Sequence, residues 1–150
     1  MSIYLSQHGK SAAKSEDPRR GLTAEGAAEV ERVARIMAES DCPVDIIWHS
    51  GKARAAQTAE IFAAALNPAD GVRTREGIDP LDDVTALAAH LDEDRNEMFV
   101  GHLPFMERMI SYLILGDPER RVLRFRNGGV VCVDWHADES RWTIDWAVYP

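Results

Sequence analysis

Two histidines and one arginine stand where apolar runs of the sequence end. His8 and His102 each adjoin a glycine at the end of such a run, and Arg54 lies shortly after the end of a third. If the three runs are neighbouring parallel strands, both imidazoles and the guanidinium meet at one edge of a sheet. Helix N-termini at the same edge would add oriented N–H groups, so the expected occupant is an anion such as phosphate. Lys10 and Arg20, on the segment that follows His8, are candidates for the same site.

The segment that precedes His8 has the alternation of a β-strand. Ile3 and Leu5 alternate with more polar neighbours, and the run is too short for a helical repeat. It ends at His8-Gly9, where glycine permits a tight turn and leaves space beside the ring. Open α/β sheets place their chemistry at the carboxyl ends of strands, so the position of His8 suits a functional residue.

Strand and helix patterns alternate along the rest of the chain. Further strand patterns cover residues 44–48, 72–78, 97–102, 129–135 and 142–149, and helical patterns begin near residues 23, 52, 83 and 104. This order predicts an α/β fold, a three-layer sandwich whose mostly parallel central sheet carries helices on both faces and has an antiparallel C-terminal edge. For the helix that begins near residue 52, we expect the apolar side to be Ile61, Phe62, Ala65 and Leu66.

Composition restricts the classes of protein that fit. The 150 residues suit a single domain, 1–150, and the 25 acidic against 17 basic residues give a net charge of −8, which argues against a nucleic-acid surface. No apolar stretch approaches the ~20 residues of a membrane span, and a strand pattern beginning at residue 3 leaves no place for a signal peptide. Cys42 and Cys132 lack metal-type spacing, so we expect reduced thiols, a cytoplasmic protein and no metal or cofactor.

Four ordered segments together resemble the histidine phosphatase superfamily, also called phosphoglycerate-mutase-like. Their order and spacing match over nearly the whole chain, and the small size is most similar to the SixA-type phosphohistidine phosphatases. The segments are Gln7-His8-Gly9, Leu22-Thr23-Ala24-Glu25-Gly26, residues 50–59 (Ser-Gly-Lys-Ala-Arg-Ala-Ala-Gln-Thr-Ala) and Val100-Gly101-His102-Leu103-Pro104.

The resemblance implies a role for each matched residue. It implies that His8 is the nucleophile, which takes the phosphoryl group and gives a phosphohistidine that water later hydrolyses. It implies that Arg54 clamps phosphoryl oxygens, that His102 donates to them, and, by a looser match, that Arg20 faces the substrate. Phosphoryl transfer depends mainly on positioning and on positive charge around the oxygens, which agrees with these residue types.

The chain departs from the family signature Arg-His-Gly at its first position, which is Gln7. Glutamine keeps an N–H donor for phosphate but lacks the charge and the fork, and Lys10 is a candidate for part of the missing charge. A hydrogen bond to a charged group contributes about 1.5–3 kcal/mol, so the change bears on catalysis. The acids Asp79, Asp82 and Asp83 are read as turn and N-cap residues rather than as a general acid.

Three functions remain open from the sequence. The first is a phosphatase acting on a protein phosphohistidine, for example of a histidine phosphotransfer domain, and this reading predicts a shallow, open pocket. The second, favoured by Gln7, is a module that binds phosphate or phosphohistidine without efficient turnover. The third is a small-molecule phosphomonoesterase, which needs a carboxylate close to His8.

Overall fold

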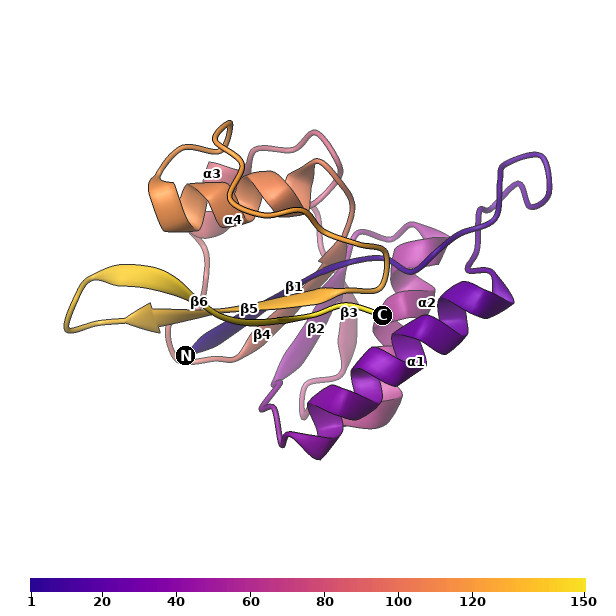
Figure 1. Ribbon diagram of the computed structural model, residues 1–150, viewed down its shortest axis with the longest axis horizontal. Coiled ribbons are helices and arrows are strands. Elements are labelled where there is room, and N and C mark those ends of the chain that lie inside the picture. The colour runs from indigo at the N-terminus through magenta and orange to yellow at the C-terminus, as the bar shows by residue number, and fades with distance from the viewer.

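Six strands form one sheet, and helices cover both of its faces (Figure 1). The computed structural model describes all 150 residues. The strands are β1 Ser2–Gln7, β2 Ile46–His49, β3 Val72–Thr74, β4 Glu97–Gly101, β5 Val130–His136 and β6 Arg141–Val148. The helices are α1 Ala24–Glu39, α2 Ala53–Leu66, α3 Val84–Ala88 and α4 Phe105–Leu115.

The strand order is β3-β2-β4-β1-β5-β6. β3, β2, β4 and β1 pair in parallel, whereas β5 is antiparallel to both β1 and β6. This confirms the predicted mostly parallel sheet with an antiparallel C-terminal edge. In the register of the sheet, Gln7 is opposite Gly101 and His49 is opposite Val100. The segments that follow β1, β4 and β2 therefore leave the sheet side by side.

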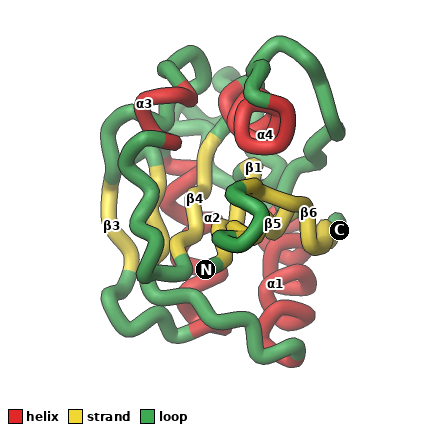
Figure 2. Tube along the Cα trace, turned by 90° about the vertical axis from the view of Figure 1, so that its left-hand side faces the viewer, coloured by secondary structure: helices red, strands yellow, loops and turns green.

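Each face of the sheet buries its own apolar cluster. Tyr4 faces the cluster shared with α1 and α2, whereas Ile3 and Leu5 face the cluster shared with α3 and α4. The alternation along β1 thus sends successive side chains to opposite layers. Figure 2 shows α3 and α4 on one side of the strands and α1 on the other. The three-layer sandwich is confirmed.

Helix α2 buries Phe62 as expected, and its most buried stripe otherwise consists of small residues. Its buried residues are Ala55, Thr58, Ala59 and Phe62, whereas Ile61, Ala65 and Leu66 are only partly buried. The buried stripe keeps helical spacing, and its small side chains let α2 pack closely against α1 and the sheet. Of this stripe, the sequence analysis identified Phe62 but not Ala55, Thr58 and Ala59, which are small or polar. The strand expected over residues 72–78 is shorter in the structure, where β3 covers Val72–Thr74.

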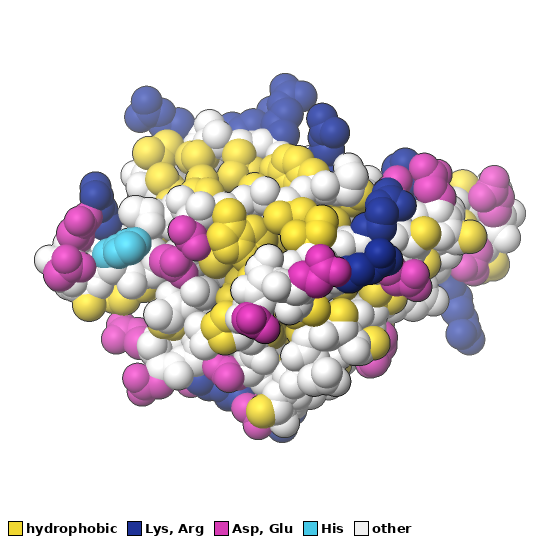
Figure 3. Space-filling model, turned by 60° about the horizontal axis from the view of Figure 1, so that its bottom comes forward, with side chains coloured by type: hydrophobic (Ala, Val, Ile, Leu, Met, Phe, Trp, Pro, Cys, Tyr) yellow, Lys and Arg dark blue, Asp and Glu magenta, His cyan; other side chains and the backbone are white.

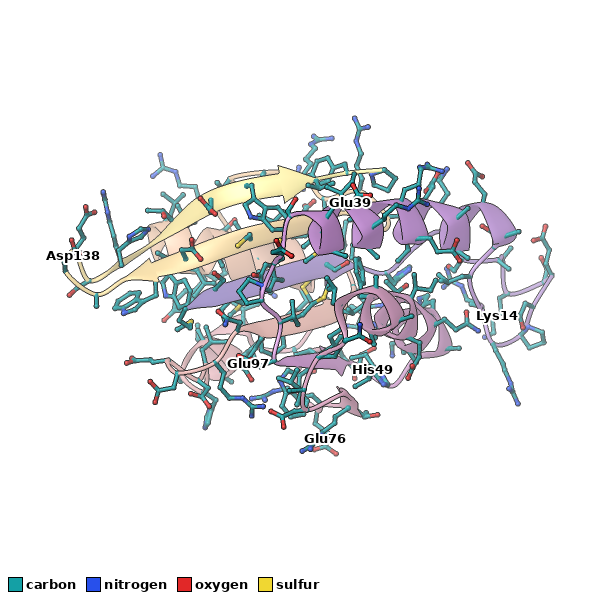
Figure 4. All side chains as sticks on the ribbon, turned by 90° about the horizontal axis from the view of Figure 1, so that it is seen from below. Lys14, Glu39, His49, Glu76, Glu97 and Asp138 are labelled. Carbon is teal, nitrogen blue, oxygen red and sulfur yellow. The ribbon has the colours of Figure 1, made fainter.

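The surface carries both signs of charge. On the face in Figure 3, acidic and basic side chains are interspersed around apolar areas. Figure 4 places Lys14, on the loop that follows β1, and Asp138, in the turn between β5 and β6, at opposite ends of the molecule. No helix combines the length and apolar character that crossing a membrane requires.

Candidate active site

His8 follows β1 directly, and its ring has one nitrogen fixed and one available. Its Nδ1 lies 2.7 Å from the carbonyl oxygen of Gly9. A carbonyl can only accept, so Nδ1 carries the proton and Nε2 of the neutral ring carries the lone pair. Arg54 Nε lies 3.3 Å from Nε2 and donates to it. The available nitrogen of His8 therefore faces the guanidinium of Arg54.

Hydrogen bonds from strand β4 and from one loop hold the backbone of His8. Its N–H donates to the carbonyl oxygen of Gly101 at 3.0 Å, which continues the pairing of β1 with β4. Its carbonyl oxygen accepts from Asn127 Nδ2 at 3.0 Å and from the N–H of Gly128 at 3.1 Å. Asn127 was not identified from the sequence, because a lone asparagine in a loop carries no pattern that marks it. The loop before β5 thus fixes the backbone of His8.

Helices α1 and α2 both touch the turn that follows His8. Thr58 on α2 accepts from the N–H of Gly9 at 3.0 Å and donates to the carbonyl oxygen of Arg54 at 2.7 Å. Helix α1 begins at its N-cap Thr23, and its Gly26 packs so closely that a Cβ there would lie 2.2 Å from the carbonyl oxygen of Lys10. Thr58 was also missed, although its place one helical turn after Arg54 was a usable signal.

His102 follows β4 and lies against His8. The two ring centroids are 5.1 Å apart, and the ring planes are inclined at 54°. Ser50, just after β2, places its Oγ 2.6 Å from His102 Nε2. The other nitrogen, Nδ1, is buried and has no hydrogen-bond partner, and the residue is only 2% exposed. His8, Arg54 and His102 are thus brought together, as the sequence predicted.

The charged groups that act on the two imidazoles are all cations. Burial lowers the pKa of His8 below its ordinary 6.5, and the charges of Arg54 and Arg20 lower it further. Burial lowers the pKa of His102 to about 3, with His8, Arg54 and Lys52 adding to the shift. Burial and the charge of Arg20 also lower the pKa of Arg54. Both rings are therefore neutral at pH 7, and cations surround them.

The remaining predicted site residues differ in where they lie. Arg20 has a positive φ of 51° and is close enough for its charge to act on both His8 and Arg54. Lys10 is directed elsewhere, since its Nζ makes ion pairs with Glu25 and Glu29 on α1 at 3.0 and 3.3 Å. The structure therefore gives no support for Lys10 as a phosphate ligand.

Gln7 has a buried Oε1 without a hydrogen-bond partner. The side chain lines a hollow of about 470 Å³ together with Leu103, Arg126 and other residues, but His8, Arg54 and His102 do not line it. The position that distinguishes this chain from the family signature thus has free volume beside it.

A further cation acts on His102 and pairs with an acid. Lys52 immediately precedes α2, its charge acts on His102, and its Nζ pairs with Asp79 at 3.5 Å. Lys52 was not among the predicted site residues. Asp82 accepts from the N–H of Asp79 at 2.8 Å and Asp83 caps α3, so these two acids have the turn and cap roles expected of them.

One group of side chains has ligand types that bind metals. Cys132, Asp134 and Asp145 place a ligand atom each within 4.8 Å of one another. Asp134 pairs with Ser2 at the start of β1, so this group lies at the opposite end of that strand from His8. Burial raises the pKa of the Cys132 thiol to about 12, which disfavours the thiolate that metals bind.

The fold and the site together define a class of protein. A mostly parallel sheet presents two neutral imidazoles and a guanidinium at its carboxyl edge, which is an arrangement suited to binding and transferring a phosphoryl group. The model of the histidine phosphatase superfamily (branch 1) matches residues 3–82, and this chain belongs to that family. Membership of the family supports a phosphatase activity.

The chain is also similar to particular proteins. The chain is 29% identical over 140 residues to an uncharacterized protein of Picosynechococcus sp., covering 87% of this chain and 83% of the relative. The crystal structure of a SixA protein from Agrobacterium tumefaciens matches with a TM-score of 0.79 and 26% identity, covering 99% of this chain and 97% of the other.

Two more distant structures share the fold. The protein histidine phosphatase SixA complexed with tungstate has a TM-score of 0.85 at 23% identity, covering 100% of this chain and 97% of that one. A phosphoserine phosphatase from Entamoeba histolytica has a TM-score of 0.76 at 16% identity, covering 99% and 97%.

Proposed function

We propose that this protein is a phosphatase that removes the phosphoryl group from a protein phosphohistidine through a phosphohistidine intermediate on His8. The observation that carries the proposal is the state of the His8 ring. Gly9 holds the proton on Nδ1, so the lone pair is on Nε2, beside the guanidinium of Arg54. A neutral nitrogen next to a phosphate-binding cation is what attack on phosphorus requires.

The first step transfers the phosphoryl group to the enzyme. The N–H of Arg54 turns from His8 Nε2 to a phosphoryl oxygen, and the freed lone pair forms a bond to phosphorus while the bond from phosphorus to the substrate imidazole breaks. The substrate ring, protonated beforehand on its free nitrogen, leaves as a neutral imidazole. In the second step water attacks phosphorus, the bond to His8 Nε2 breaks, the lone pair returns to that nitrogen, and the phosphate product keeps the protons of the water.

The surroundings favour a leaving group that needs no acid from the enzyme. The charged groups that lower the pKa of His8 and His102 are cations, and neutral His102 has no excess proton to give. A phosphoester leaving as an alkoxide needs such a proton, whereas an imidazole protonated beforehand does not. This argument favours phosphohistidine over small-molecule phosphomonoesters. A protein that carries phosphohistidine, such as a histidine phosphotransfer domain, is the substrate class that fits.

A second candidate function is a binding module for phosphate or phosphohistidine with little turnover. Gln7 favours this candidate, because the carboxamide brings no charge to a position where the family signature has arginine. An arginine that acts on the transition state contributes on the order of a thousandfold in rate, so binding can persist where turnover is slow.

Rapid mixing with a phosphorylated donor separates the two candidates. The protein is mixed with phosphoimidazole or a phosphohistidine protein, quenched in alkali, and examined by mass spectrometry for a phosphoryl adduct. The phosphatase predicts an acid-labile adduct on His8 that forms in a burst and then decays, and the variant His8→Asn forms none. Retention of the donor without an adduct supports the binding module. A parallel assay with p-nitrophenyl phosphate tests for a phosphomonoesterase, which would turn over both compounds comparably.

A further inference from the structure

The buried imidazole of His102 has a single hydrogen-bond partner, the hydroxyl of Ser50. The distance from Ser50 Oγ to His102 Nε2 is 2.6 Å. The backbone N–H of Lys52 also points at this oxygen, at 3.4 Å. Nδ1 of the same ring is buried with no partner. Only the contact with Ser50 therefore distinguishes the two ring nitrogens.

The direction of the hydrogen bond between Ser50 and His102 is inferred from the donors and acceptors that contact the Ser50 hydroxyl. A serine hydroxyl has one hydrogen to donate, and its oxygen can accept at the same time. The N–H of Lys52 supplies the oxygen with a donor, and His102 Nε2 is the one acceptor in contact with the hydroxyl. Nε2 is therefore the protein acceptor that the structure offers to the serine hydrogen. Since the ring is neutral, its own proton is on Nδ1.

We propose that Ser50 is a positioning residue that fixes His102 as the Nδ1–H tautomer, so that this buried N–H donates to an oxygen of the bound phosphoryl group. The inference rests on the proposed function, in which phosphate lies beside His8. A buried donor without a partner destabilises the free site, and an incoming phosphoryl oxygen relieves that cost. Ser50 thus acts on the substrate through the orientation and proton position of His102.

The tautomer of His102 is measured directly by long-range ¹H–¹⁵N NMR, with the signals assigned by their loss in His102→Asn. We expect the native protein to show a protonated Nδ1 and a bare Nε2. The variant Ser50→Ala removes the donor to Nε2 and should shift His102 toward the Nε2–H tautomer. The matched control Ser50→Thr keeps a hydroxyl at the same position and should retain the native signals. Circular dichroism establishes that each variant folds.

Function is measured on the same three proteins. We expect Ser50→Ala to lower kcat/KM for phosphohistidine about tenfold and to weaken binding of inorganic phosphate by a similar factor, and Ser50→Thr to restore both. An Nε2–H tautomer in the native protein overturns the proposal, as does a Ser50→Ala variant with unchanged tautomer, turnover and phosphate affinity. The NMR and phosphate titrations need no turnover, so they test Ser50 even if the native protein fails to hydrolyse phosphohistidine.

Discussion

The ends of β1 and β4 present the same kind of ring in opposite ways. After β1, the carbonyl of Gly9 fixes Nδ1 of His8 and leaves Nε2 available beside Arg54. After β4, the hydroxyl of Ser50 engages Nε2 of His102 and leaves Nδ1 available. A carbonyl forces a proton onto its ring nitrogen, whereas a hydroxyl can give one. The partner of each ring, rather than the ring itself, makes one histidine suited to attack and the other suited to donate.

Removing the ring of His8 or of His102 should have the largest effect on activity, and the two variants test whether the rings have different roles. We expect His8→Ala to abolish formation of the phosphoryl adduct and to lower turnover by at least about a thousandfold, because no other nucleophile remains. We expect His102→Ala to lower turnover by roughly a hundredfold while the adduct on His8 still forms. Single-turnover kinetics with a phosphohistidine protein measures both. Equal losses of adduct in the two variants would contradict the separate roles.

Arg54 is the group that distinguishes the surroundings of His8. We expect Arg54→Ala to lower turnover by on the order of a hundred- to a thousandfold, because its guanidinium donates to His8 Nε2, the nucleophile in the proposed function. Arg54→Lys should recover only part of this loss, since an ammonium cannot contact two oxygens in a fork. The matched control is Arg35→Ala, on the exposed side of α1, which should leave turnover unchanged. Loss of activity in the control would point to folding instead.

The substitution Gln7→Arg restores the family signature at the end of β1 and tests whether charge is lacking there. The family signature has a charged, forked side chain at position 7, where Gln7 brings only a neutral carboxamide. We therefore expect turnover of phosphohistidine to rise by about tenfold or more. The measurement is kcat/KM against the native protein, with Gln7→Leu, which has neither charge nor polar group, as the control. An unchanged rate in Gln7→Arg would refute the view that charge is lacking.

The smallest expected effect is that of pH on the free energy of unfolding. The folded pKa values of His8 and His102 lie below the ordinary 6.5, so the unfolded chain binds more protons once the pH falls below 6.5. The free energy of unfolding should therefore decrease on acidification from pH 6.5, and for His102 the decrease should continue toward about pH 3. Urea titrations between pH 7 and 4 measure it. His102→Asn should flatten this dependence, and a stability that rises on acidification would contradict the assigned directions.

Sequence reasoning located the three central residues because they follow strands, and strand patterns are local. His8, Arg54 and His102 could be placed together once β1, β4 and β2 were assumed to be neighbours, which the strand order confirms. Lys10 stays a prediction as a phosphate ligand, because nearness in sequence does not fix the direction of a side chain. Glu25 and Glu29, one helical turn apart on α1, offered its ammonium two carboxylates.

The partners of the histidines could not be predicted in the same way. Ser50 and Asn127 act through single hydrogen bonds to residues 52 and 119 positions away along the chain, and such pairs leave no periodic pattern. Only the folded sheet determines which loops meet. A sequence can thus indicate where imidazoles gather, but which of their nitrogens carries the proton depends on contacts that form after folding.

Asn127 and Gly128 both donate hydrogen bonds to the carbonyl oxygen of His8, and these bonds have a consequence for biosynthesis. A nascent chain that emerges from the ribosome as far as Gly101 already contains β1, β2, β3 and β4, together with Arg54. It still lacks Asn127, and it lacks β5, which pairs with the other side of β1. The surroundings of His8 are therefore complete only after the chain has been synthesised through Gly128 and β5.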